Sequence, residues 1–164
     1  MSLRSEIRPN SLSCPEICIN ALREKDLEGR KMAKKILVVD DELDMRTFIT
    51  TLLETNGFKP LSAADGVEGM EIAHAKKPSL IILDVMMPRE SGISMYRELK
   101  NDPDLKDIPV IMVSALSKKT FFHSQKVLDE YKEEKIPEPA AYIEKPPEPD
   151  ELLEAVQKNL KQPQ

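Results

Sequence analysis

The chain has 164 residues and a formal net charge of −5, with 40% hydrophobic and 32% charged residues, which fits one globular domain plus a tail. This negative charge disfavours nonspecific binding to nucleic acid or to anionic membranes. No apolar run approaches the roughly 20 residues needed to cross a bilayer, and the N-terminus lacks the apolar core of a signal peptide. We therefore expect a cytoplasmic protein with no membrane partner.

Residues 1–33 are expected to form an N-terminal extension, because Met32-Ala33-Lys34-Lys35, just before the first strand, resembles a natural start, and Met1-Ser2-Leu3 could be left over from cloning. Within the extension, Ser13 and Glu16 have capping-box spacing, and apolar residues follow on one helix face. A short, partly ordered extension is the simpler interpretation, and an amphipathic helix that docks on a partner or a second copy is the alternative. Cys14 and Cys18 lie here without neighbouring histidines, so we expect free thiols rather than a metal site.

Strands and helices are predicted to alternate along residues 34–164. The expected strands are 36–39, 59–62, 80–83, 110–113 and 141–143. The expected helices are 43–56, 67–75, 93–100, 118–135 and 150–160. Continuous apolar runs such as 80–83 are typical of parallel strands buried on both faces. This pattern predicts an α/β fold: a doubly wound, five-stranded parallel sheet in the flavodoxin-like order 2-1-3-4-5, with helices on both faces.

The fourth helix is predicted to be elongated. Phe121, Val127, Leu128 and Tyr131 recur at roughly helical spacing among charged residues. The helix should end before Pro137, because a residue that precedes proline disfavours helix. A mobile surface loop is the alternative.

Acidic residues follow two of the predicted strands. Asp40 and Asp41 follow the first strand, and Asp84 follows the third. Ligands of such sheets bind outside the carboxyl ends of the strands, at the switch point, so these acids should lie together. Three carboxylates repel one another unless a cation neutralises them, and oxygen ligands suit Mg²⁺. Taken alone, Asp40 and Asp41 could simply be the favourable acidic start of a helix; with Asp84 opposite, we favour the metal.

Asp84 is also the candidate nucleophile, because a carboxylate can attack phosphorus. A turn-forming aspartate is the simpler alternative, but it does not explain an acid at the end of a fully apolar strand. Ser114 and Lys145 follow the fourth and fifth strands and could contact a phosphate. A serine at a strand end is ordinary, a lone lysine is more often solvated, and Tyr142 would most often be a half-buried aromatic.

Four short segments together resemble the response-regulator receiver domain of two-component signalling, of the single-domain chemotaxis-regulator kind. The segments are Val38-Val39-Asp40-Asp41-Glu42, Asp84-Val85-Met86-Met87-Pro88 with Gly92 beyond, Val110-Ile111-Met112-Val113-Ser114-Ala115, and Tyr142-Ile143-Glu144-Lys145-Pro146. Each segment alone is a weak indication, but all four in this order at strand ends are highly specific. The resemblance runs from Lys35 to about Leu160.

The resemblance implies that Asp84 accepts a phosphoryl group from a histidine kinase or a phosphotransfer protein. It also implies that Mg²⁺ is held by Asp40, Asp41, Asp84 and the main-chain carbonyl of Met86. Such a domain catalyses at most its own phosphorylation and dephosphorylation, and so is not an enzyme in the usual sense.

The resemblance further implies that Ser114 and Lys145 contact the phosphoryl oxygens, and that Ser114 and Tyr142 act as the switch. It suggests a cis peptide bond between Lys145 and Pro146. The face of helix four, strand five and helix five would signal to an unknown output protein. We expect no DNA-binding domain, because only residues 161–164 follow the last helix.

Two departures from the family and two alternative functions stay open. The interval from Ser114 to Lys145 is longer than usual by about two helical turns, and Pro147 replaces the usual aromatic. One alternative is a non-phosphorylated scaffold with the receiver fold. The less favoured one is an aspartate-nucleophile phosphatase, which needs an acid two residues after the nucleophile, where Met86 stands.

Overall fold

The computed structural model describes residues 33–87, 92–123 and 137–161. Ala33–Gln164 forms one compact unit, which carries all the elements described below, and Met1–Met32 falls in another. Residues 1–32 lie outside the described part of the chain, so the expected N-terminal extension stays a prediction. No helix of the described residues is long and apolar enough to span a membrane.

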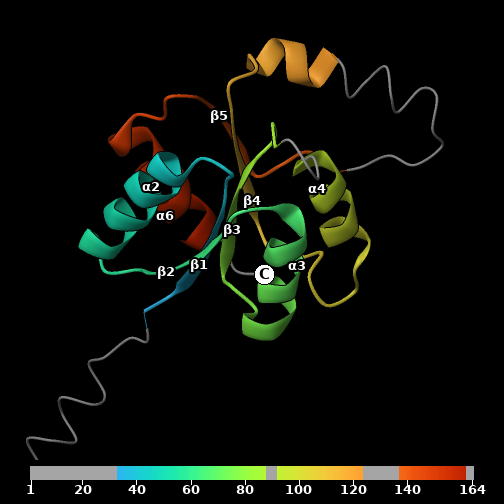
Figure 1. Ribbon diagram of the computed structural model, residues 1–164, viewed down its shortest axis with the longest axis horizontal. Helices are drawn as coiled ribbons and strands as arrows, with labels where there is room; N and C mark the ends of the chain where they lie inside the picture. Colours follow the sequence, from blue (N-terminus) through green and yellow to red (C-terminus); the bar gives the residue numbers. More distant parts are fainter. Residues whose placement is uncertain (1–32, 88–91, 124–136, 162–164) are drawn as a thin grey trace, which may run out of the picture. The chain divides into compact units, whose positions relative to one another are not determined.

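Five parallel strands form a single sheet in the order β2-β1-β3-β4-β5 (Figure 1). The strands are β1 (Lys35–Val39), β2 (Lys59–Ala63), β3 (Leu80–Asp84), β4 (Val110–Ser114) and β5 (Ala141–Glu144). Every residue of the two central strands β3 and β4 is buried, whereas β2 at the edge, which holds Pro60, is largely exposed or half-buried. This arrangement confirms the predicted fold class, the strand order and the edge position of the strand with proline.

The helices cover both faces of the sheet (Figure 1). They are α2 (Leu43–Thr55), α3 (Gly66–Lys76), α4 (Gly92–Asn101) and α6 (Pro149–Lys161). Alternate strand residues serve opposite faces: Ile36 and Val38 pack in one core cluster with residues of α2 and α6, and Leu37 and Val39 in the other with residues of α3 and α4. Burial on both faces explains why the strands have no polar alternation.

Local hydrogen bonds fix where the helices begin and end. Asp65 caps α3, since its carboxylate accepts from Glu68 N at 2.9 Å, while Glu68 accepts in return from Ala64 N at 2.7 Å. This reciprocal pair is the capping-box arrangement. After α2 the chain turns at Gly57, whose φ of 81° favours glycine.

Only the first turns of the predicted elongated helix fall within the described residues. Residues 118–123 are helical, and Ser117 caps them by accepting from Thr120 N at 3.2 Å. The rest of the expected helix, from residue 124, lies outside the described part, so its elongation stays a prediction. Where the described chain resumes, the Tyr96 hydroxyl donates to the carbonyl of Pro137 at 2.8 Å and attaches this point to α4.

Candidate functional site

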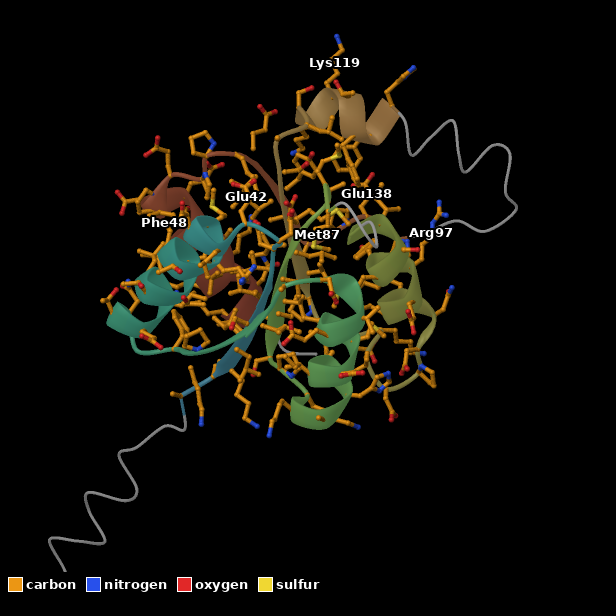
Figure 2. All side chains as sticks on the ribbon, viewed as in Figure 1. Glu42, Phe48, Met87, Arg97, Lys119 and Glu138 are labelled. Atoms are coloured by element: carbon orange, nitrogen blue, oxygen red, sulfur yellow. The ribbon has the colours of Figure 1, made fainter. Side chains whose placement is uncertain are left out.

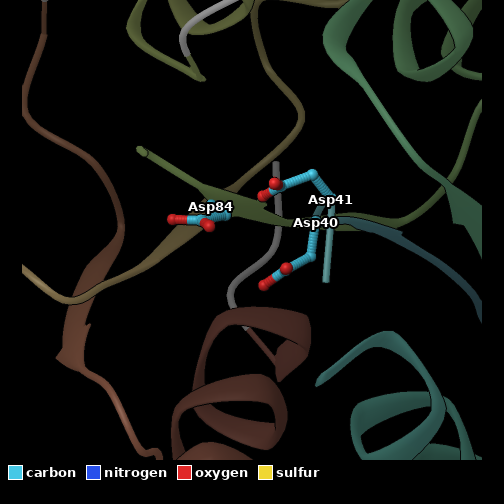
Figure 3. Close-up of side chains that lie close together, drawn as sticks. All are labelled: Asp40, Asp41 and Asp84. Carbon is cyan, nitrogen blue, oxygen red and sulfur yellow. The ribbon is translucent and has the colours of Figure 1, made fainter. Parts of the chain in front are cut away.

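The carboxyl ends of β1 and β3 bring three aspartates together. Val39 is in register with Leu83, so Asp40 and Asp84, the next residues along, leave adjacent strands at the same level. Asp41 follows Asp40 into the loop before α2. Each of Asp40, Asp41 and Asp84 offers a carboxylate oxygen, and these oxygens all lie within 4.8 Å of one another (Figure 3). The structure thus groups the acids as their positions at strand ends predict.

Lys145 lies among these acids and balances part of their charge. Its Nζ is 2.8 Å from Oδ2 of Asp40 and 2.8 Å from Oδ2 of Asp84. The aspartate side chains are 2% exposed and that of Lys145 is 9% exposed, so the group is almost entirely removed from water. A third carboxylate, that of Glu42, lies 3.4 Å from the same ammonium and is largely exposed. The lysine therefore offsets the repulsion between two buried carboxylates.

Burial and pairing act in opposite directions on the ionisation of this group. Burial raises the pKa of Asp84 above its usual value, although hydrogen bonds from Lys145 and from the Met86 N–H oppose the rise. Burial alone would lower the pKa of Lys145, but the hydrogen bonds to Asp40 and Asp84 outweigh it and raise that pKa. Lys145 is thus held as a cation against the two carboxylates.

Turns orient the two buried carboxylates. Oδ1 of Asp40 accepts from the N–H of Glu42 at 2.9 Å, and Oδ1 of Asp84 accepts from the N–H of Met86 at 2.9 Å. Each aspartate thus uses one oxygen to fix its own loop and turns the other toward Lys145. The Asp41 side chain is exposed and makes no such bond in the described part of the chain, so it is free to take a ligand.

The turn after β3 requires a glycine at position 92. A Cβ atom there would lie 1.8 Å from the carbonyl oxygen of Asp84, and Gly92 N donates to Val85 O at 3.2 Å. The start of α4 thus packs directly against the backbone of the candidate nucleophile.

Ser114 and Tyr142 shape the neighbouring loop. Ser114 ends β4, is fully buried, and its Oγ accepts from Leu116 N at 3.2 Å. The Tyr142 hydroxyl donates to Leu116 O at 2.9 Å, and its ring packs on Phe121 at 4.9 Å between centroids. Burial raises the pKa of Tyr142, so it stays a neutral donor. Tyr142 therefore contacts the loop that follows Ser114.

Lys145 and Ser114 are also connected through the backbone. Lys145 N donates to Ser114 O at 2.8 Å, where β4 and β5 end side by side. The Lys145–Pro146 peptide bond is cis, which confirms that prediction. In the same region, the Glu144 carboxylate accepts from Lys118 N at 2.9 Å and links the end of β5 to the first turn of the helical segment 118–123.

Three site residues received no role of their own from the sequence. Glu42 appeared only as the last residue of a motif, yet its carboxylate lies 3.4 Å from the Lys145 ammonium. Arg46, one turn into α2, donates to the carbonyls of Asp40 and Asp41. Gly92 appeared only as part of a motif. For Arg46, the only sequence signal is an arginine about one turn after paired acids. For Gly92, its approach to Asp84 is visible only in the folded backbone.

The aspartate cluster fits a small divalent cation. The three side chains offer only oxygen atoms, which Mg²⁺ prefers, and oxygens on opposite sides of a bound Mg²⁺ lie about 4.2 Å apart. The ligand atoms of the three side chains lie within 4.8 Å of one another, which is close to this distance. Exposed Asp41 leaves one side open for water, which Mg²⁺ retains.

Comparisons with known proteins agree with this architecture. Residues 36–157 match the family model of the response regulator receiver domain. Among solved structures, the chemotaxis protein CheY4 of Vibrio cholerae superposes with a TM-score of 0.66 and 25% identity, covering 77% of this chain and 98% of that one. The N-terminal domain of a response regulator receiver protein from Methanoculleus marisnigri JR1 gives 0.55 and 33%, covering 79% and 98%.

Curated relatives match over about half of this chain. The phosphate regulon transcriptional regulatory protein PhoB of Escherichia coli (strain K12) is 42% identical over 84 residues, 51% of this chain and 37% of that protein. The polar-differentiation response regulator DivK of Brucella anthropi is 36% identical over 89 residues, 54% of this chain and 72% of its own length. The aligned part thus spans only about a third of the transcriptional regulator. Since the family model covers most of the chain, the protein belongs to the response regulator receiver domain family of two-component signalling.

Proposed function

We propose that this protein is a phospho-accepting response regulator. It takes a phosphoryl group from a histidine kinase or a phosphotransfer protein onto Asp84 in a Mg²⁺-dependent reaction in the cytoplasm. The observation that carries the proposal is the buried Asp84 carboxylate, 2.8 Å from Lys145 and grouped with Asp40 and Asp41. In this proposal residues 34–164 are the receiver domain and residues 1–33 an extension.

In the transfer step, a carboxylate oxygen of Asp84 attacks phosphorus as the bond between phosphorus and the donor nitrogen breaks. The products are an acyl phosphate on Asp84 and a histidine whose imidazole takes up a proton. Asp84 must be ionised to attack, and Lys145 favours that form because its hydrogen bond opposes the effect of burial on the pKa. Asp40, Asp41, Asp84 and the carbonyl of Met86 would hold Mg²⁺, which supplies neutralisation of the phosphoryl oxygens.

Lys145 and Ser114 are proposed to hold the transferred group. Lys145 now bridges Asp40 and Asp84 and would turn its ammonium to a phosphoryl oxygen, a suitable partner for a compact point charge. The Ser114 hydroxyl, which now accepts from Leu116 N, would donate to a second phosphoryl oxygen. The hydroxyl can donate while it still accepts from Leu116 N, so the bound phosphoryl group and the loop after Ser114 would be connected through this one oxygen.

The change would pass to the surface through Tyr142. Its hydroxyl is bound to Leu116 O, so displacement of the loop breaks this bond and frees the ring to change rotamer. Helical segment 118–123, β5 and α6 would then present an altered face to an output protein. The transcriptional regulator PhoB is matched over only 37% of its length, so its output is not carried over.

The two alternatives make different demands on the site. A scaffold that is never phosphorylated has no need of a buried lysine between two buried carboxylates, which is costly to maintain. A phosphatase with an aspartate nucleophile needs an acid where Met86 presents an exposed thioether chain instead. The geometry therefore supports the phospho-acceptor best.

Incubation with radiolabelled acetyl phosphate and Mg²⁺ tests the proposal. We expect label that is stable to gel electrophoresis but released by mild acid or base, and no label when EDTA replaces Mg²⁺. Steady release of nitrophenol from nitrophenyl phosphate would indicate the phosphatase instead. Absence of label, together with no binding of beryllofluoride, would indicate the scaffold.

A further inference from the structure

Arg46 binds the backbone of the loop that carries the two adjacent acids. Its Nη1 donates to the carbonyl of Asp40 at 2.7 Å and to the carbonyl of Asp41 at 3.1 Å. The arginine is half-buried in the first turn of α2, and this one side chain binds the carbonyls of both acids. We call residues 40–42 the acid loop.

The other bonds of the acid loop hold Asp40 and Glu42. Asp40 N donates to Ala63 O at 3.3 Å, and Glu42 N donates to the side chain of Asp40 at 2.9 Å. Lys145 pairs with both carboxylates, and Arg46 N donates to Glu42 O at 3.0 Å. None of these bonds involves the carbonyl of Asp41. Within the described part of the chain, that carbonyl accepts a hydrogen bond from Arg46 only.

The orientation of the Asp41 peptide determines where its carboxylate lies. Asp41 is exposed, and no other described side chain holds its carboxylate near Asp84, yet an oxygen of each lies within the 4.8 Å group. We propose that Arg46 is a positioning residue: by fixing the Asp40 and Asp41 carbonyls, on either side of Asp41, it keeps the Asp41 carboxylate turned toward Asp84 and so sets the affinity for Mg²⁺. This inference rests on the proposed function of the site.

Charge and positioning make opposite predictions for Arg46. A guanidinium near a cation site repels the cation, so on charge alone its removal would tighten Mg²⁺ binding. Loss of the two carbonyl bonds would instead let the acid loop spread and weaken binding. Outer-shell partners of metal ligands typically contribute about 10–100-fold in affinity, which exceeds the repulsion expected of a half-solvated charge. The sign of the change therefore separates the two effects.

The experiment is a titration of the unphosphorylated, full-length protein with MgCl₂, followed by NMR through the backbone amides of Glu42 and Met86. We expect Arg46→Met to weaken Mg²⁺ binding by about tenfold, and Arg46→Lys, which can bond one carbonyl, to weaken it less. The matched control is Arg97→Met on α4, which removes the same charge far from the acid loop and should leave the affinity unchanged (Figure 2). Urea unfolding of each variant reports the stability of the fold separately.

Equal or tighter Mg²⁺ binding by Arg46→Met would overturn the positioning role, as would equal losses in Arg46→Met and Arg97→Met. If Arg46→Met does not fold, the same comparison between Arg46→Lys and the original protein decides. A second readout is phosphoryl uptake from acetyl phosphate, where Arg46→Met should need more Mg²⁺ for half-maximal rate and recover most of the rate at saturation. If the unsubstituted protein neither binds Mg²⁺ nor takes up label, the proposed function itself fails, and this inference with it.

Discussion

Lysines lie at both ends of the parallel strands, but in different surroundings. We call the side of the sheet where the strands begin the amino edge, and the side where they end the carboxyl edge. At the amino ends of the strands, Lys34 donates to Leu160 O at 2.7 Å and Lys77 pairs with Asp104 at 3.5 Å, with both partners of that pair more than half exposed. At the carboxyl ends, Lys145 pairs with two aspartates at 2.8 Å, and all three side chains are nearly or fully buried. The residue types are the same, and what differs is access to water.

This difference decides what each edge can do. Lysines at the amino edge lie near helix C-termini, where a cation is favoured by the helix dipole and water screens any further interaction. At the carboxyl edge little water screens the charges: burial raises the pKa of Asp84, and the hydrogen bonds to Asp40 and Asp84 raise the pKa of Lys145. An ion pair therefore has little effect on stability and ionisation at the amino edge, and a large effect on both at the carboxyl edge.

The largest contrast should come from removing one carboxylate at each edge. Asp84→Asn is expected to abolish uptake of label from acetyl phosphate, because the amide cannot act as the nucleophile. Asp104→Asn, the same change at the amino edge, should leave uptake unchanged. Scintillation counting of the isolated proteins measures both. Label retained by Asp84→Asn would show that the acceptor is another residue.

Removing one lysine at each edge should lower the free energy of unfolding by different amounts. Lys145→Met leaves two buried carboxylates without a partner and should lower the free energy of unfolding by about 3 kcal/mol without Mg²⁺. Lys77→Met breaks an exposed pair and should change it by less than about 0.5 kcal/mol. Urea denaturation measures both, and adding Mg²⁺ should reduce the deficit of Lys145→Met only. Equal effects at the two edges would contradict the contrast.

Metal binding should depend on the acid loop. Asp41→Ala removes the exposed ligand and should weaken Mg²⁺ binding by at least about tenfold, since loss of a ligand exceeds loss of an outer-shell partner. Asp40→Ala should weaken it too. Asp44→Ala, an acid in the first turn of α2 outside the cluster, is the control and should have little effect. Phosphoryl uptake that persists in EDTA would remove the need for the metal altogether.

The smallest effect concerns the lifetime of the phosphoryl group. Hydrolysis needs a water in line with the bond to phosphorus, oriented by a polar neighbour. Met86 and Leu116, each two residues after a site residue, cannot orient it, and Met86 lies exposed at the rim. Met86→Asn and Leu116→Glu should each speed the loss of label several-fold in a pulse-chase measurement. An unchanged rate in both would show that something else limits hydrolysis.

Much of this site follows from sequence because a parallel sheet turns strand order into proximity. An apolar run such as Leu80–Leu83 needs burial on both faces, so the acid after it must emerge at the sheet edge where Asp40 emerges. Side-chain contacts between residues that do not follow a strand cannot be predicted from strand order. Glu42 pairs with Lys145, 103 positions further along the chain, and nothing in the local sequence indicates this contact. The hydrogen bonds from Arg46 to the Asp40 and Asp41 carbonyls, and the close approach of Gly92 to Asp84, likewise depend on backbone positions that only the fold determines.

The central claim is that one carboxylate, that of Asp84, carries the phosphoryl group, and its chemistry allows a direct test. Borohydride reduces an aspartyl phosphate to homoserine, so the protein can be incubated with acetyl phosphate and Mg²⁺, reduced, digested and sequenced by tandem mass spectrometry. The account predicts homoserine at position 84 alone, and none when EDTA is present. Homoserine at position 40, 41 or elsewhere, or at position 84 regardless of Mg²⁺, would contradict it.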